Sequence, residues 1–360
     1  MINFDHNAST PPFAAVIARV AEVMAEGGNP SAVHALGRRA HNHLETARRQ
    51  VATLVQARAR DVTFFGSATE AHATLIRHFD EAEFLRPATE HAAVLAARRG
   101  EDLALNSTAA LDLEALDQRL RRAQGPVLLA VAAANNETGL LSDLAALAKT
   151  VASAKAAGRE LHYHIDAVQA PGKLPIDFAA WGCDSLVLSA HKMGGPQGVA
   201  ALVTRPGFNV KPLILGGGQE RRRRAGTENV AGIAGFGLAC ELCQLRPETL
   251  PLRERLEAGL TAQNPAALIV GQGQARLPNT TCLLTPGKAA ATLLMQFDLA
   301  GLALSSGSAC SSGKIGSSPV LVAHGYGAAL VGSALRFSLG RDSSAAEVDR
   351  AVALYGDLCR

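Results

Sequence analysis

The chain has 360 residues, of which 48% are hydrophobic and 19% are charged, so it can bury a large core and is long enough for two or three domains. Lys and Arg number 35 and Asp and Glu 32, and the resulting net charge of +3 gives no reason to expect a polyanionic partner. Aromatic residues make up only 4%, which argues against a stacking platform for single-stranded nucleic acid. We therefore expect no direct binding of nucleic acid.

The sequence carries no sign of membrane insertion or export. No apolar stretch reaches the ~20 residues that a membrane-spanning helix needs. The first residues lack the basic and apolar regions of a secretory signal. Six cysteines are too few for a disulfide scaffold and are expected to be thiols. We therefore expect a cytoplasmic protein that does not associate with membranes.

Helical and strand patterns alternate through the first 245 residues. This alternation predicts an α/β fold with a mostly parallel sheet flanked by helices. The segments with the clearest patterns are, in chain order, a helix over 31–55 beginning near Ser31, strands over 62–65 and 127–132, a helix over 144–157, strands over 161–166, 185–189 and 198–203, and a helical stretch over 235–245.

The pattern changes near residue 246, where Arg246 and Pro247 interrupt the chain and a charged helix over 252–262 follows. Shorter elements fill the remainder. We predict a large domain over 14–246 and a smaller α+β domain formed by 1–13 and 247–360.

Polar side chains gather directly after four of the predicted strands. Ligands of open α/β sheets bind beyond the carboxyl ends of the strands, so these side chains are candidates for one site. Small hydroxyl residues, amides, one acid and one lysine suit a phosphorylated ring that contains nitrogen. The candidates are Ser67, Ala68, Thr69, Asn136, Asp166, Gln169, Ser189, Ala190, His191 and Lys192.

Each candidate taken alone has an ordinary structural explanation. The segment at Ala68 and Thr69 could be a simple helix start, Asp166 a helix cap or surface ion pair, and Lys192 a solvated lysine. Together they indicate pyridoxal phosphate. A lysine amine forms a Schiff base with its aldehyde, and a carboxylate beside the ring nitrogen keeps that nitrogen protonated. Free N–H groups at a helix start attract the phosphate.

Two further segments carry chemistry. Residues 305–313 are rich in Gly and Ser and contain Cys310, which predicts a mobile loop with an exposed, nucleophilic thiol; a linker that happens to contain cysteine is the alternative. The run over 221–224 consists of four arginines. It is short for a nucleic-acid footprint, and we interpret it as fixing a loop or an interface through bidentate pairs.

The sequence resembles the cysteine desulfurases of the NifS/IscS type, within the class V aminotransferase group, along nearly its whole length. The resemblance implies the large and small domains of fold type I of the pyridoxal-phosphate-dependent transferases. The matching segments are FDHNAST (4–10), GGNPSAVHALG (27–37), SATEA (67–71), EHAAVL (90–95), AANNETG (133–139), HIDAVQAPGKLPID (164–177), LSAHKMGGPQGVAAL (188–202), GGGQERRRRAGTENVAGI (216–233), RLPNT (276–280), SSGSACSSG (305–313) and LRFSLGR (335–341).

The resemblance implies a role for each matching position. Catalytic roles fall to Lys192 as the Schiff-base lysine, to His91 in ring stacking and proton transfer, and to Cys310 as the sulfur acceptor. The implied cofactor ligands are Asp166 at the ring nitrogen, Asn136 and Gln169 at the ring hydroxyl, Ala68, Thr69, Ser189, Ala190 and His191 around the phosphate, and Thr227 at the phosphate of a neighbouring subunit. The implied substrate ligands are Arg336 at the carboxylate, with Asn7 and Asn29 lining the same pocket.

The activity implied by this resemblance is the removal of sulfur from L-cysteine, which leaves L-alanine and a persulfide on Cys310. The protein would be a homodimer that passes its sulfur to an iron–sulfur scaffold or to another acceptor protein. No intrinsic metal site is implied, although Cys310 could serve as a transient ligand of an iron–sulfur cluster held by a scaffold partner.

The chain departs from the usual pattern of this group at His6, His72 and Arg222, and in the order Gly66-Ser67-Ala68 before the Thr-Glu, where Gly or Ser-Gly is usual. We expect none of them to contact the lysine, the aspartate or the acceptor thiol. Two other functions stay open. A selenocysteine lyase or an aminotransferase of the same fold would share Lys192 and Asp166 without needing Cys310, and an inactive homologue would act only as a scaffold.

Overall fold

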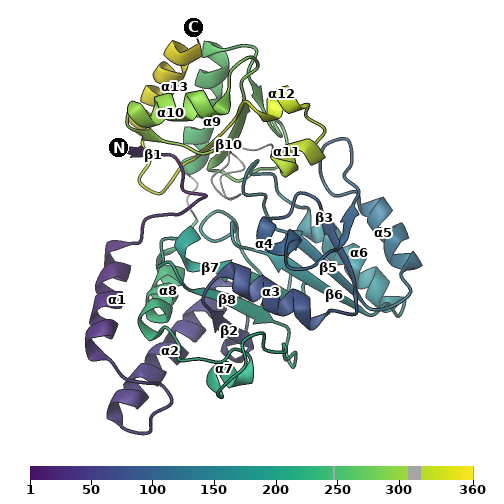
Figure 1. Ribbon diagram of the computed structural model, residues 1–360, viewed down its shortest axis with the longest axis vertical. Coiled ribbons are helices and arrows are strands. Elements are labelled where there is room, and N and C mark those ends of the chain that lie inside the picture. Colours follow the sequence, from purple (N-terminus) through teal and green to yellow (C-terminus); the bar gives the residue numbers. More distant parts are fainter. Residues whose placement is uncertain (246–247, 307–317, 360) are drawn as a thin grey trace.

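The computed structural model describes residues 1–245, 248–306 and 318–359. It confirms the predicted α/β class (Figure 1). The strand order of the large sheet is β2-β8-β7-β6-β5-β3-β4. All neighbours are parallel except the two pairs made by β8. The strands are β2 (Val62–Phe65), β3 (Glu83–Pro87), β4 (Glu101–Leu103), β5 (Val127–Ala132), β6 (Leu161–Asp166), β7 (Ser185–Ser189) and β8 (Ala200–Thr204).

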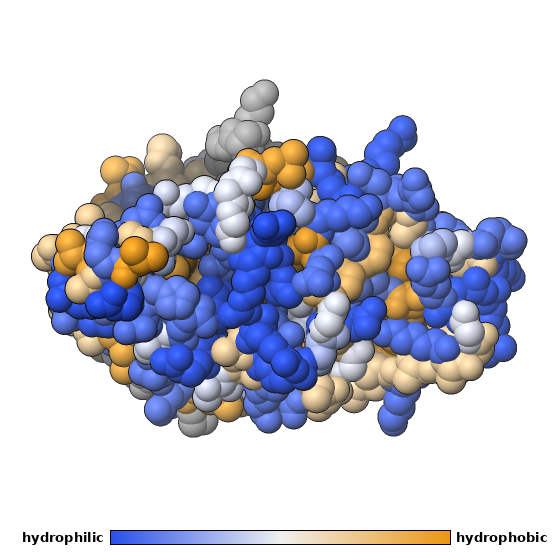
Figure 2. Space-filling view, turned by 90° about the horizontal axis from the view of Figure 1, so that it is seen from below, coloured by the Kyte–Doolittle hydropathy of each residue, from blue (hydrophilic) through white to orange (hydrophobic). Residues whose placement is uncertain are grey.

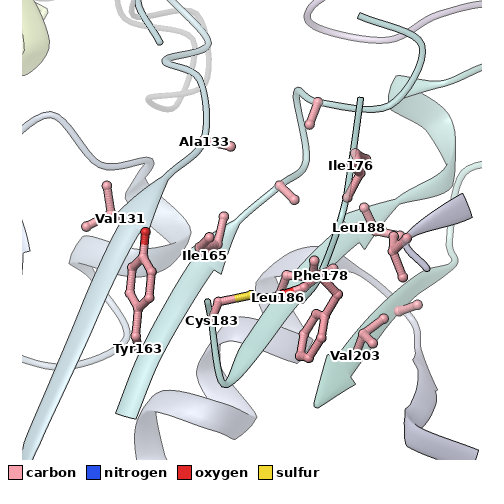
Figure 3. Close-up of a cluster of buried hydrophobic side chains, with 14 of the residues drawn as sticks. Val131, Ala133, Tyr163, Ile165, Ile176, Phe178, Cys183, Leu186, Leu188 and Val203 are labelled. Atoms are coloured by element: carbon pink, nitrogen blue, oxygen red, sulfur yellow. Dashed lines mark hydrogen bonds between the residues drawn. The ribbon is translucent and has the colours of Figure 1, made fainter. Parts of the chain in front are cut away.

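Side chains alternate between the two faces of this sheet, as a strand period of two requires. On β7, Leu186 and Leu188 enter the main core, whereas Val187 packs on the opposite face. Figure 3 shows Tyr163 and Ile165 of β6 in the main core as well. That core is covered by α2 (Ala35–Leu54), α5 (Leu113–Arg122), α6 (Leu144–Ala156) and α8 (Val230–Leu242), and the opposite face by α3 (Ala68–His78) and α4 (Ala92–Leu95).

A second body with its own core is built mainly from the last third of the chain. Strands β9 (Leu268–Ile269), β10 (Thr280–Leu284) and β12 (Ala334–Ser338) form an antiparallel sheet. Its core contains Phe297, Phe337 and Tyr355. The helices here are α9 (Thr249–Gln263), α10 (Ala290–Leu299), α11 (Pro319–Ala323), α12 (Ala328–Val331) and α13 (Ala345–Cys359). The division at residue 246 stays a prediction, which these separate cores support.

The N-terminal segment belongs spatially to this second body. β1 (Ile2–Asn3) pairs in parallel with β11 (Leu302–Ala303), and both chain ends lie at the same end of the molecule (Figure 1). The chain then runs back through α1 (Ala14–Glu26), which packs against α8. Short elements complete the description: α7 (Gln219–Arg222) and the 3-10 turns Ala59–Asp61 and Ala190–Lys192.

Several predicted boundaries are wrong by a few residues. α2 begins at Ala35 rather than near Ser31, because the Asn29 side chain accepts a hydrogen bond from the Ser31 amide and closes a turn there. His34 then caps the helix by accepting from the Gly37 amide. β8 starts at residue 200 rather than 198, α8 covers 230–242 rather than 235–245, and α9 covers 249–263 rather than 252–262.

The face of the molecule in Figure 2 is largely hydrophilic, with apolar side chains gathered in a few places. Within the three described ranges, no helix is long and apolar enough to cross a membrane.

A buried ion pair anchors the loop that carries α7. Arg48 of α2 donates two hydrogen bonds of 2.8 Å to the Glu220 carboxylate, and Phe64 of β2 donates its amide to the same group at 2.9 Å. Both charged side chains are almost fully buried. Glu220, Arg221 and Arg222 adopt left-handed φ angles of 46°, 58° and 66°, which non-glycine residues rarely do. The pair therefore holds a strained segment against the sheet.

The arginine run fixes this loop, but not through bidentate pairs as predicted. Arg221 donates to the carbonyl of Arg60, and Arg223 donates to the Asn209 side chain. Arg224 donates a single bond from Nε to Glu70. The bidentate contact in this region comes from Arg48, which the sequence analysis did not single out.

Replacing Arg48 with Met should destabilise the protein by about 3–5 kcal/mol, because the Glu220 carboxylate would stay buried without its counter-charge. Urea unfolding at pH 7 measures the effect. The double variant Arg48→Met with Glu220→Leu removes both charges and should recover most of the loss. A single variant as stable as the wild type would contradict this account.

Candidate cofactor site

A cavity of about 450 Å³ opens beyond the carboxyl ends of β2, β5, β6 and β7. These ends meet because the four strands point the same way, β8 alone being reversed between β2 and β7. The predicted residues that line the cavity are Ala68, Thr69, His91, Asn136, Asp166, Gln169, Ser189, His191 and Lys192.

One end of the cavity is suited to a phosphate. Ser67 caps α3 by accepting a hydrogen bond from the Glu70 amide, so the first turn of the helix, with Ala68 and Thr69, faces the cavity. The positive end of the helix dipole favours an anion at this position. Burial and then the nearby Lys192 lower the pKa of His191 to about 4, so His191 is neutral near pH 7 and can donate one N–H.

Asp166 ends β6 as a buried carboxylate at the cavity wall. Its Oδ1 accepts the amide of Val168 at 2.9 Å, and its Oδ2 lies 3.4 Å from Nε2 of His72. Burial alone would raise the pKa of Asp166, but His72 and the Val168 amide outweigh burial and lower it below its ordinary value. The carboxylate is therefore an anion that can accept a hydrogen bond from an N–H group of a bound ring.

Lys192 lies at the end of the turn that follows β7, and its amine is held at the cavity by main-chain oxygens. Nζ donates to the carbonyls of Asn7 and Ala8, both at 2.8 Å. The amine is thus positioned by the N-terminal segment, which lies 184 and 185 positions earlier in the chain.

A second lysine lies close to the first. Lys173 donates from Nζ to Gln169 Oε1 at 2.6 Å and to Asn7 Oδ1 at 3.1 Å. Gln169 in turn donates from Nε2 to the Asn7 carbonyl. Lys173 thereby fixes which end of the Gln169 amide carries the donors. Burial of the amine and the charge of Lys192 lower the pKa of Lys173 to about 7.

His91 presents an oriented ring to the cavity. It caps α4, and its Nδ1 accepts the amide of Ala93 at 3.0 Å. A neutral ring with Nδ1 as acceptor carries its proton on Nε2. His91 therefore offers a donor at Nε2 and becomes a base only after that proton has left.

The remaining predicted residues lie outside the cavity lining. Arg336 is buried behind Asn136, whose carbonyl it contacts at 3.1 Å, and it pairs with Asp5 at 2.6 Å. Asn7 borders the site through its carbonyl. The others are Ala190, which is buried, Asn29 and Thr227, which are exposed, and Cys310, which lies outside the described residues.

Two residues at the site were not predicted. We expected His72 to avoid the aspartate, and this expectation is wrong: His72 is buried between α3 and β6 and approaches the Asp166 carboxylate. The chain spacing could not show this contact, since it depends on how α3 crosses the sheet. Lys173 lies four residues after Gln169, a spacing that could have paired the two side chains.

Over the described parts of the chain, no group of three or more His, Cys, Asp and Glu side chains is arranged to hold a metal ion.

The Lys173 pKa makes stability depend on pH. Between pH 7 and about pH 10 the folded amine is neutral while the unfolded one still binds a proton, so this residue should make stability rise with pH in that window. In Lys173→Met this contribution is lost, so the stability of the variant relative to wild type should fall between pH 7 and about pH 9.5. Urea unfolding of the cofactor-free protein measures it. The exposed Lys149→Met is the control, and parallel behaviour of both variants would refute the assignment.

Known proteins match this chain over nearly its full length. A cysteine desulfurase of Cereibacter sphaeroides is 40% identical over 90% of this chain and 87% of its own, and one of Bradyrhizobium diazoefficiens is 38% identical over 99% and 94%. The solved NifS-like protein of Rickettsia africae superposes with a TM-score of 0.91 at 34% identity, covering 99% of both chains. The family model for class-V aminotransferases matches residues 2–351, and the chain belongs to that family.

Proposed function

We propose that this chain is a cysteine desulfurase that depends on pyridoxal phosphate. The observation that carries the proposal is a single cavity lined by a lysine amine, a buried carboxylate and the start of a capped helix. These groups match the aldehyde, ring nitrogen and phosphate of that cofactor. The full-length likeness to proteins named cysteine desulfurase supports L-cysteine as the substrate.

The residues of the site fit the cofactor in charge and in donor type. The α3 start and neutral His191 supply N–H donors for the phosphate, and the Asp166 anion accepts the ring N–H. Gln169, oriented by Lys173, offers an amide donor to the ring hydroxyl. When bound, the cofactor draws electron density away from the amino acid and weakens the bond between Cβ and sulfur.

The chain's own groups would perform the remaining steps. Lys192 or His91 removes the proton from Cα. The Cys310 thiolate attacks the substrate sulfur, forming an S–S bond while the C–S bond breaks, and the electron pair returns to the carbon skeleton, which is protonated to give L-alanine. Cys310 would then pass the persulfide sulfur to a thiol of an acceptor.

A homodimer is part of this proposal. Thr227 and Asn29 are exposed and do not line the cavity of their own chain, and from the surface they could reach a second copy. Apolar side chains also remain exposed on this chain: Ile17, Met24, Val33 and Leu215 are 58%, 69%, 89% and 80% accessible. We further propose an iron–sulfur scaffold, or another thiol-bearing carrier, as the sulfur acceptor.

Substrate binding needs a rearrangement at Arg336. Its guanidinium is paired with Asp5 and is only 1% exposed, so a substrate carboxylate must compete with Asp5 for it. Replacing Arg336 with Lys removes the bidentate fork and should raise KM for L-cysteine by about tenfold or more, with a smaller change in kcat. Steady-state kinetics tests this, and an unchanged KM would place the carboxylate elsewhere.

Cys310→Ala separates the proposed activity from its rivals. The variant should keep the visible absorbance of bound pyridoxal phosphate but lose more than about a thousandfold in alanine formation from L-cysteine, because the nucleophile is missing. Mass spectrometry should find a persulfide on the Cys310 peptide of the wild type. The half-buried Cys359→Ala is the matched control and should retain activity.

Other outcomes identify other functions. Undiminished turnover of L-selenocysteine by Cys310→Ala would indicate a selenocysteine lyase, and amino transfer to a keto acid would indicate an aminotransferase. Purified protein that neither binds the cofactor nor forms an adduct on Lys192 would indicate an inactive scaffold.

A further inference from the structure

A chain of buried polar side chains extends from Asp166 into the protein, away from the cavity. The alternation of β6 places His162, His164 and Asp166 on the face covered by α3, opposite the main core that holds Tyr163 and Ile165 (Figure 3). We call the side chains behind the carboxylate the histidine relay: His72, His164, Ser185 and His162. All four are at most 5% exposed.

The contacts of the relay are continuous. Nδ1 of His72 lies 2.9 Å from Nε2 of His164, whose Nδ1 lies 2.9 Å from the Ser185 hydroxyl. The same hydroxyl lies 2.8 Å from Nε2 of His162. At the other end, Nε2 of His72 has no hydrogen-bond partner of good geometry, and it lies 3.4 Å from the Asp166 carboxylate.

The number of protons restricts how this chain can be arranged. Burial, and then the rings of His72 and His162, lower the pKa of His164 well below its ordinary value. Burial lowers the pKa of His162 to about 3, so both rings are neutral at neutral pH. A neutral imidazole has one donor and one acceptor. Once the direction of one bond is fixed, the direction of every other bond follows.

An anion at the end fixes that direction. If His72 is neutral and donates from Nε2 to Asp166, its Nδ1 must accept from Nε2 of His164. The Nδ1 of His164 then accepts the Ser185 hydroxyl proton. The hydroxyl oxygen accepts in turn from Nε2 of His162. In this arrangement every donor points toward the carboxylate, and each contact joins one donor to one acceptor.

We propose that the histidine relay holds His72 in the tautomer that donates from Nε2 to Asp166, and so keeps the carboxylate an anion for the cofactor ring nitrogen. The relay acts through Asp166, so its members are positioning residues rather than catalytic ones. The inference rests on the proposed cofactor.

The other titratable and charged groups around the histidine relay do not take over its role of donating a hydrogen bond to Asp166. Near Asp166 lie Glu90 and His91. Burial, together with the Asp166 charge, raises the pKa of Glu90 to about 8, so Glu90 is mainly a neutral acid at neutral pH, and its Oε1 accepts the amide of Ala132 at 2.8 Å. Near His162 lie His78, Asp184, Lys155 and Arg205, and Asp184 is already paired with Lys155 at 2.6 Å.

Two replacements of His72 by side chains of similar size test whether its N–H donor is needed. Gln can donate an N–H toward Asp166, whereas Met cannot. We expect His72→Met to bind pyridoxal phosphate about ten- to a hundredfold more weakly than wild type, and His72→Gln to stay within about threefold. Equilibrium binding to the cofactor-free protein measures this. Equal affinity of both variants and wild type would overturn the inference.

A cofactor analogue isolates the ring nitrogen. In the carbocyclic analogue, C–H replaces that nitrogen and nothing donates to Asp166. The loss caused by His72→Met should therefore shrink to within about threefold for the analogue. An equal loss for both compounds would mean that His72 only shapes the cavity. A wild type that binds neither compound would instead refute the proposed cofactor.

Ser185→Ala tests the part of the histidine relay that lies farther from Asp166, and it leaves the residues that line the cavity unchanged. It removes the donor to His164, and we expect a smaller but measurable weakening of cofactor binding, of about three- to tenfold. Thr204→Val on the neighbouring strand is the matched control, since its hydroxyl bonds only to the Asp61 carbonyl. Equal effects of the two variants, or none, would contradict a relay.

Nitrogen-15 NMR of labelled histidines in the cofactor-free protein reads the tautomers directly. The inference requires His164 to carry its proton on Nε2 and to leave Nδ1 bare. The opposite tautomer would mean that His72 is doubly protonated and that every bond behind His72 is reversed, which would overturn the proposed direction.

Discussion

The site depends on keeping a carboxylate charged inside the protein. A buried anion is costly unless donors surround it, and Asp166 stands at the end of a strand whose neighbours are mostly apolar. The amide of Val168 and the ring of His72 supply the compensation. The helix start, the lysine and the amide donors can be assembled from ordinary turns and helix ends, but this charge needs a partner from another element.

The large sheet brings the loops that follow its strands together into a single site. Four strands deliver their carboxyl ends to one edge, and reversing β8 alone leaves that edge undisturbed. The α3 face carries the polar side chains behind Asp166, and the other face carries the apolar core (Figure 3). Because side chains alternate along β6, the polar groups that support the Asp166 charge lie on one face of the sheet and the main hydrophobic core lies on the other.

Much of this arrangement could be predicted from the sequence, because it depends on patterns among residues that are close together in the chain. The strands β5, β6 and β7 follow from their apolar runs and residue alternation, and Asp166 and Lys192 follow from their places at strand ends. The start of α2 was misplaced because a side-chain turn at Asn29 competes with the helix.

Contacts between distant elements were beyond such patterns. The approach of His72 to Asp166 is set by the crossing of α3 over β6, and the pairing of Arg48 with Glu220 joins residues 172 positions apart. One signal was present: polar residues at 162, 164 and 166 share one face of a strand that is otherwise apolar. Thr227 and Asn29 are exposed and do not line the cavity, so nothing within the described chain joins them to the site.

The pairing of β1 with β11 has a consequence for biosynthesis. The carbonyls that hold Lys192 belong to residues 7 and 8, while Asp5 is tied to Arg336, 331 positions further along. A ribosome releases the N-terminal end first and its partners almost last. During translation the N-terminal segment therefore stays unanchored, and the carbonyls that position the Lys192 amine take their places only once the nascent polypeptide is nearly complete.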